Sequence, residues 1–98
     1  MNRVVDKEPL TNVADMWREE RAADELMILT LYEKPLDFPN HYVIRPHFVG
    51  AGQPRFSRGC MLFATKENAA VWVGTHFPDL VPVPRSYEDE PQIVGSWI

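Results

Sequence analysis

Three histidines and one cysteine are the side chains of this chain that could ligate a metal or act as a nucleophile. His41 and His47 are six residues apart, whereas ligand pairs in zinc motifs are two to five residues apart, so only a site assembled by the fold would hold a metal. Cys60 precedes Met-Leu-Phe-Ala, and a thiol in apolar surroundings is usually an inert buried side chain. A dyad of Cys60 with His47 or His76 would require the fold to bring them together. The sequence therefore favours a protein that is not an enzyme and binds no metal and no cofactor.

A second group of residues could bind a partner. The middle of the chain interleaves positive charge with an aromatic ring, in Arg45, His47, Arg55, Phe56 and Arg58. Arginine and aromatic residues are enriched in protein-binding hot spots, and they also form platforms for single-stranded nucleic acid. Because the formal net charge is −4 and nucleic-acid binding relies on neutralising phosphates, a protein partner is favoured over nucleic acid. Trp97, one residue from the end, is the candidate aromatic for a dimer or partner contact.

The element expected to position these residues is Leu26–Tyr32, the longest mostly apolar run, which contains no Gly or Pro. Seven such residues suit a buried strand better than a buried helix. A short amphipathic helix over residues 12–23, capped by Thr11 or Asn12, is expected before it. The loop 33–40 holds two prolines, and we expect Leu36 and Phe38 to fold back onto the core.

The remaining elements alternate with turns. Residues 41–49 read as a strand in which Pro46 predicts an edge position or a bulge. A buried strand is expected at 60–64, a helix capped by Thr65 at 66–76, and strands at 80–84 and 92–98.

These elements predict an α+β fold: a mostly antiparallel sheet of four to five strands and two short helices, in the order α-β-β-β-α-β-β. Residues 1–10 are expected to be a flexible N-terminal tail and residues 11–98 a single domain. The first helix could also be an accessory arm, since Met27 offers a second starting point for the domain.

The composition predicts a cytoplasmic protein. No apolar run approaches the ~18 residues of a membrane span, and the first eight residues lack the apolar core of a signal peptide. A single cysteine fits a reducing compartment. The acidic ends and mildly basic centre of the chain could favour self-association.

Two stretches resemble small uncharacterised proteins of proteobacterial genomes and prophages. One is Leu31-Tyr32-Glu33-Lys34-Pro35-Leu36-Asp37-Phe38-Pro39 with Tyr42-Val43-Ile44-Arg45, and the other runs from Leu80 to Arg85 and from Pro91 to Ile98. The resemblance covers residues 27–98 and implies no activity. A phage setting would suggest a small inhibitor of a host or defence complex, such as an anti-CRISPR protein.

The function expected from these observations is a non-enzymatic protein-binding module that forms a homodimer. The alternative is a small acidic inhibitor, encoded by a phage, that occupies the basic channel of a nucleic-acid-handling or defence complex. A cysteine-dependent enzyme is the third reading.

Overall fold

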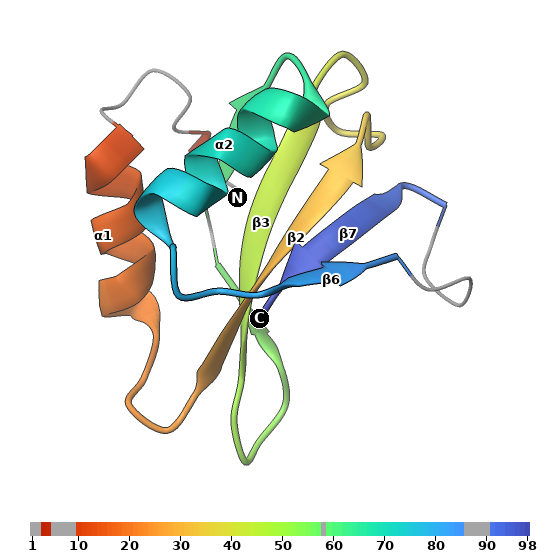
Figure 1. The fold of residues 1–98 in the computed structure, drawn as a ribbon. Coiled ribbons are helices and arrows are strands. Elements are labelled where there is room, and N and C mark those ends of the chain that lie inside the picture. Colours follow the sequence, from red (N-terminus) through yellow and green to blue (C-terminus); the bar gives the residue numbers. More distant parts are fainter. Residues whose placement is uncertain (1–2, 5–9, 58, 86–90) are drawn as a thin grey trace.

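The computed structural model describes residues 3–4, 10–57, 59–85 and 91–98. The elements follow one another as β1 (Arg3–Val4), α1 (Leu10–Glu20), β2 (Leu26–Glu33), β3 (Tyr42–Val49), β4 (Arg55–Phe56), β5 (Gly59–Phe63), α2 (Lys66–His76), β6 (Pro82–Pro84) and β7 (Ile93–Trp97). The α+β class is confirmed, and the predicted order holds once the two-residue strands β1 and β4 are added to it (Figure 1).

The apolar run at the start of β2 lies in the middle of the sheet, as predicted. The strand order is β1-β5-β3-β2-β7-β6, and β4 pairs with β3 outside this path. β2 pairs with β3 along all eight of its residues and with β7 on its other side, both antiparallel. Only β1 and β5 pair in parallel among the described strands. Leu29 in this run is fully buried, because both edges of β2 are paired and one of its faces carries the core.

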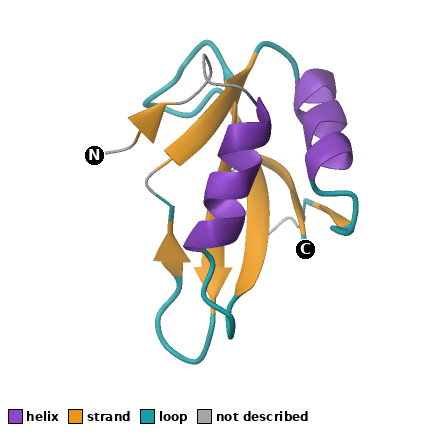
Figure 2. Cartoon of the chain, turned by 90° about the vertical axis from the view of Figure 1, so that its left-hand side faces the viewer, coloured by secondary structure: helices purple, strands orange, loops and turns teal. Residues whose placement is uncertain are grey.

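Both helices contribute to one core on one face of the sheet. α2 crosses the middle of the sheet and α1 packs beside it (Figures 1 and 2). The core consists of residues from both helices and of alternate residues of β2, β3 and β5, among them Trp17, Leu29, Ile44, Met61 and Val73. Because side chains alternate along a strand, the other residues of these strands point to the opposite face. The described chain places no helix on that face.

α2 spans the residues predicted for it. The Thr65 side chain accepts a hydrogen bond from the Asn68 backbone N–H at 3.1 Å, which satisfies one of the free donors of the first turn. Pro78 follows Phe77, the C-cap residue, and a proline cannot continue the helix.

α1 begins at Leu10, two residues earlier than predicted, so Thr11 and Asn12 lie within the helix and do not cap it. It ends at Glu20, three residues earlier than predicted. Beyond it, the Glu25 carboxylate accepts from the Ala22 backbone N–H at 2.9 Å, and the Arg21 guanidinium donates to the Glu25 carbonyl at 2.8 Å. These bonds stabilise a turn, so the helix stops although no Gly or Pro marks its end.

Pro46 does not place β3 at an edge, and that prediction is wrong. β3 lies between β2 and β5. The Pro46 carbonyl accepts from Ser57 N–H at 3.1 Å, so the Pro46 nitrogen also points away from β2. There β5 pairs with β3 only as far as Ile44, and β4 pairs from His47 onward. The missing N–H of proline therefore falls where neither strand needs a donor.

Leu36 does not fold back onto the core, since it is 95% exposed. The loop is held by its own backbone instead: Phe38 N–H donates to the Pro35 carbonyl at 3.0 Å, and His41 N–H to the Phe38 carbonyl at 3.2 Å. Lys34, with φ 45°, turns the chain out of β2. A loop fixed in this way needs no leucine anchor.

The predicted flexible tail falls largely outside the described residues, which omit 1–2 and 5–9. Arg3 and Val4 pair with Gly59 and Cys60, so these two positions belong to the sheet.

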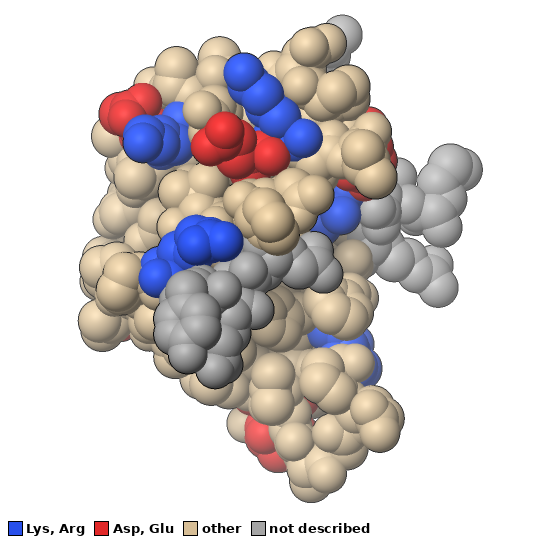
Figure 3. All heavy atoms as spheres, turned by 90° about the vertical axis from the view of Figure 1, so that its right-hand side faces the viewer, with Lys and Arg blue, Asp and Glu red and all other residues tan. Residues whose placement is uncertain are grey.

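Charged side chains are mixed on the face that carries the β6–β7 hairpin. Figure 3 shows small groups of Lys and Arg next to small groups of Asp and Glu on it, with wide uncharged areas between them. No helix among the described residues is long and apolar enough to cross a membrane.

A candidate interaction surface on the uncovered sheet face

The sheet face without helices is called the uncovered face below. It is built from the strand residues that alternate with the core residues and point away from the helices. Ile28 lies opposite His47, and Thr30 lies opposite Arg45 across the β2–β3 ladder. On the other side of β2, Thr30 lies opposite Ser96 of β7. An antiparallel sheet can leave one face to solvent, provided that this face carries polar residues. Here polar residues occupy the middle of the face, and apolar side chains surround them.

A hollow of about 450 Å³ lies on the uncovered face, and residues of β2, β3, β4, β6 and β7 line it. Its floor holds two hydroxyl groups, of Thr30 and Ser96, whose oxygens are 3.5 Å apart. Three of the exposed large apolar side chains of the described chain line it: Phe56, Val83 and Ile98 are 66%, 40% and 42% exposed. Exposed apolar side chains scattered singly need no explanation, whereas three around one hollow make this face a candidate interaction surface.

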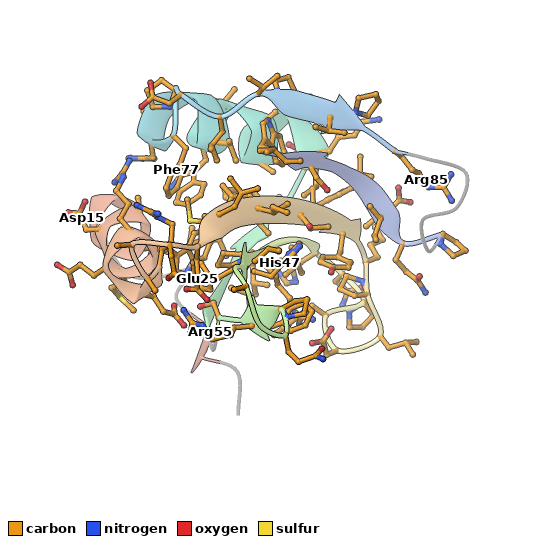
Figure 4. All side chains as sticks on the ribbon, turned by 90° about the horizontal axis from the view of Figure 1, so that it is seen from below. Asp15, Glu25, His47, Arg55, Phe77 and Arg85 are labelled. Atoms are coloured by element: carbon orange, nitrogen blue, oxygen red, sulfur yellow. The ribbon has the colours of Figure 1, made fainter. Side chains whose placement is uncertain are left out.

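His47 is one of two titratable residues that line the hollow, the other being Tyr32. Its ring lies against the Phe56 ring, with 5.5 Å between their centroids, on the side of the sheet away from α2 (Figure 4). Burial lowers the pKa of His47 below its usual 6.5, because desolvation disfavours the charged imidazolium. At neutral pH this residue therefore offers the hollow an uncharged ring.

Arg45 lies near the hollow, but its charge is used within the chain. Its guanidinium forms an ion pair with Asp37 of the preceding loop. It also lies 5.8 Å from the Tyr32 ring centroid and 6.0 Å from that of Phe38. These contacts fix the loop to the sheet and leave little of the positive charge for a partner.

Arg55 points to the helical side, because neighbouring residues of a strand face opposite sides and Phe56 faces the hollow. Its Nε donates to the Glu25 carboxylate at 2.8 Å, and its guanidinium donates to the Glu20 carbonyl at 3.0 Å (Figure 4). The guanidinium lies 5.0 Å from the Phe48 ring centroid. Arg55 therefore ties the end of α1 to β4.

The same ion pair changes the acidity of Glu25. The hydrogen bond from Arg55, helped by the Ala22 N–H, lowers the pKa of Glu25 from 4.5 to about 2. The Glu25 side chain is only 10% exposed, so this carboxylate is part of the fold rather than of a surface.

Trp97 lies opposite Leu29 and packs at the border of the core on the helical side. It lines a second groove of about 490 Å³ between α2 and the β6–β7 hairpin, together with Leu31 and Val94.

The six predicted binding residues therefore do not form one patch. His47 and Phe56 line the hollow, Arg45 lies beside it, Arg55 and Trp97 face the helical side, and Arg58 is outside the described residues. The sequence interpretation missed Thr30, Val83, Ser96 and Ile98, which reach the hollow only through the pairing of β2 with β7 and of β7 with β6.

The Cys60 side chain is fully buried, so a substrate would not reach its sulfur in this conformation. Within residues 10–57, 59–85 and 91–98 no three His, Cys, Asp or Glu side chains gather as a metal site would require. Comparisons with models of protein families, with curated proteins and with solved structures find no match for this chain.

Proposed function

We propose that this chain is a non-enzymatic protein-binding module whose partner docks on the uncovered sheet face. The observation that carries the proposal is the hollow, with exposed Phe56, Val83 and Ile98 around two hydroxyl groups and a neutral histidine. Apolar and aromatic side chains around a few polar groups are typical of the centre of a protein interface.

A nucleic-acid partner fits this face less well. Binding to nucleic acid draws its strength from cations that neutralise phosphates. Arg45 is paired with Asp37, Arg55 faces the helical side, and His47 has a lowered pKa. The whole chain also carries a net charge of −4, which repels phosphate.

The alternative, a phage-encoded acidic inhibitor of a nucleic-acid-handling or defence complex, requires a surface of one sign. The charges on the face that Figure 3 shows are mixed, so this face gives the alternative no support. A cytoplasmic setting stays a prediction, based on the single cysteine.

Affinity capture with surface variants tests the proposal. Wild-type protein, Phe56→Asp and Val71→Asp are immobilised and exposed to lysate of the organism that encodes the chain. Phe56 and Val71 are 66% and 67% exposed, and Val71 lies on α2, so the two variants are matched in exposure but not in location.

We expect Phe56→Asp to lose proteins that the wild type and Val71→Asp both retain, because a charge in the hollow opposes apolar docking. Equal retention by all three proteins would contradict the proposal, as would equal loss from both variants.

A further inference from the structure

We infer that docking on the uncovered face is coupled to a proton: a partner binds while the His47 ring is neutral and is released when the ring takes up a proton. This inference rests on the proposed function and concerns the regulation of the same surface. It requires of the partner only an apolar surface that covers this ring. It follows from the position of His47, from the charged groups near it and from the effect of docking on the ring.

The His47 ring lies where docking must cover it. His47 is on β3, opposite Ile28 of β2 on one side and opposite Phe56 of β4 on the other. Its ring centroid is 5.5 Å from that of Phe56, which is 66% exposed and lines the same hollow. A partner that packs on the Phe56 ring therefore also takes water away from the imidazole.

The groups around the ring do not favour a proton on it. None of the described residues that line the hollow is acidic, so no side chain there offers the protonated ring a counter-charge. β2 contributes the phenol of Tyr32, which is uncharged at neutral and mildly acidic pH, and β6 and β7 contribute no titratable side chain. Arg45, two residues before the histidine and on the same face of β3, is a cation that already holds Asp37. Arg55 of β4 points to the helical side, so a proton on the ring adds a second cation beside Arg45.

Docking makes the proton on this ring more costly than it is in the free protein. Burial within the fold already lowers the pKa of His47, because desolvation disfavours the charged ring. An apolar partner removes further water and brings no charge, so it lowers the pKa of His47 further. By linkage, the complex then holds fewer protons than the free protein, and the affinity falls as the pH drops below the pKa of His47 in the free protein. Above that pKa the ring is neutral in both states, and docking releases no proton.

The linkage limits the size of the effect. A single histidine with the ordinary pKa of 6.5, whose proton docking excluded completely, would weaken binding by about 30-fold between pH 7.5 and 5.0. Because the pKa of His47 lies below 6.5, we expect the dissociation constant of the wild type to rise by about 3- to 30-fold over this range. Carboxylates, including the one at Ile98, are largely ionised at both pH values and add little to the change.

Binding measured at the two pH values tests the inference. The probes are proteins that the wild-type chain retains from the lysate at pH 7.5 and that Phe56→Asp loses, each of them purified. Their dissociation constants are measured by biolayer interferometry against immobilised wild type, His47→Gln and His41→Gln at pH 7.5 and 5.0. Glutamine is uncharged at both values, and His41 lies just before β3, outside the lining of the hollow.

In the wild type and in His41→Gln the dissociation constant should rise between pH 7.5 and 5.0 by the same factor, about 3- to 30-fold. In His47→Gln this rise should be at least about threefold smaller. An equal rise in His47→Gln overturns the inference and leaves docking intact, as does tighter wild-type binding at pH 5.0, which would mean that the partner supplies a carboxylate to the charged ring. If no protein is lost by Phe56→Asp and kept by Val71→Asp, the proposed function and this inference both fail.

A second measurement needs no variant. The nuclear magnetic resonance shifts of the His47 ring, followed against pH, give the pKa of this ring in the free protein and in the complex with a purified probe protein. Docking should move the midpoint to lower pH by at least about half a pH unit, which corresponds to a threefold change in affinity. A midpoint that stays in place or moves to higher pH contradicts the inference, even if His47→Gln fails to fold.

Discussion

Replacing Trp17 by alanine should destabilise the protein strongly, because this residue joins α1 to the rest of the core. Trp17 is 1% exposed. Its ring meets Trp72 edge-on with 5.5 Å between centroids and stacks on Phe77 at 6.4 Å. Were α1 an accessory arm, its removal from the core would cost little.

The magnitude follows from this burial. Truncating a buried tryptophan to alanine typically costs about 3–5 kcal/mol, of which an edge-on aromatic pair supplies about 0.5–1.5 kcal/mol. A domain of this size has a total stability of about 5–15 kcal/mol, and each kcal/mol moves its melting temperature by about 4–8 °C. Trp17→Ala should therefore lower the melting temperature by at least about 12 °C.

Trp17→Phe should behave differently. Among the described residues no acceptor is within hydrogen-bond distance of the buried Trp17 Nε1. Removing an unpaired buried donor relieves about 1–3 kcal/mol, while the smaller ring loses about 1–2 kcal/mol of burial. The two effects largely offset each other, so the free energy of unfolding should change by no more than about 2 kcal/mol.

Thermal unfolding followed by far-ultraviolet circular dichroism measures both effects. The control is Asp15→Ala on the exposed side of the same helix, where the ion pair with Arg18 is solvent-exposed and should matter little. A melting temperature lowered by less than about 4 °C in Trp17→Ala would refute the packing of α1 onto this core.

Three further predictions concern the acid range, the neutral range and the sheet edge. The lowered pKa of Glu25 means that the stabilising effect of its carboxylate is complete above about pH 4.5 and is lost as pH falls toward 2. In urea titrations across that window, Glu25→Gln should therefore lose less stability than the wild type. The control variant Asp15→Asn should lose as much as the wild type. The pKa of His47 is lowered in the folded protein, so the unfolded chain binds a proton first as pH falls, and stability should decline below about pH 6.5. His47→Gln should make the melting temperature depend less on pH between pH 7.5 and 5. The same pH dependence in His47→Gln and in the wild type would contradict the burial of this ring. Replacing Pro82 and Pro84 by threonine adds two outward N–H donors to β6, which could pair with a strand of another molecule. Light scattering at high protein concentration should therefore show larger aggregates for this variant than for the wild type. Aggregates of the same size would mean that the prolines do not protect this edge.

The central strand and the second helix could be predicted because their signals are local. Leu26–Tyr32 is a mostly apolar run without Gly or Pro, and β2 covers it. Thr65 and Pro78 mark the two ends of the second helix, and the structure places α2 between them. The end of α1 could not be predicted in the same way, because Glu25 stops it through hydrogen bonds rather than through a helix-breaking residue.

The candidate surface was only partly predictable. His47 and Phe56 are close in sequence and meet across a short hairpin, so their contact was within reach of a pattern. Arg55 was grouped with them because β4 is two residues long and its alternation is invisible without the strand. Thr30 and Ser96 are 66 residues apart, and only the sheet order and register bring them together.

The most direct test of the central claim is a pair of ¹H–¹⁵N nuclear magnetic resonance spectra of the wild-type protein, recorded before and after addition of a protein that the affinity capture retains. If the partner docks on the uncovered face, the amide signals that move should be those of the strands lining the hollow, including Thr30, Phe56 and Ser96. Movement confined to α1 or α2, for example at Val71, would contradict the assignment of the docking surface to this face.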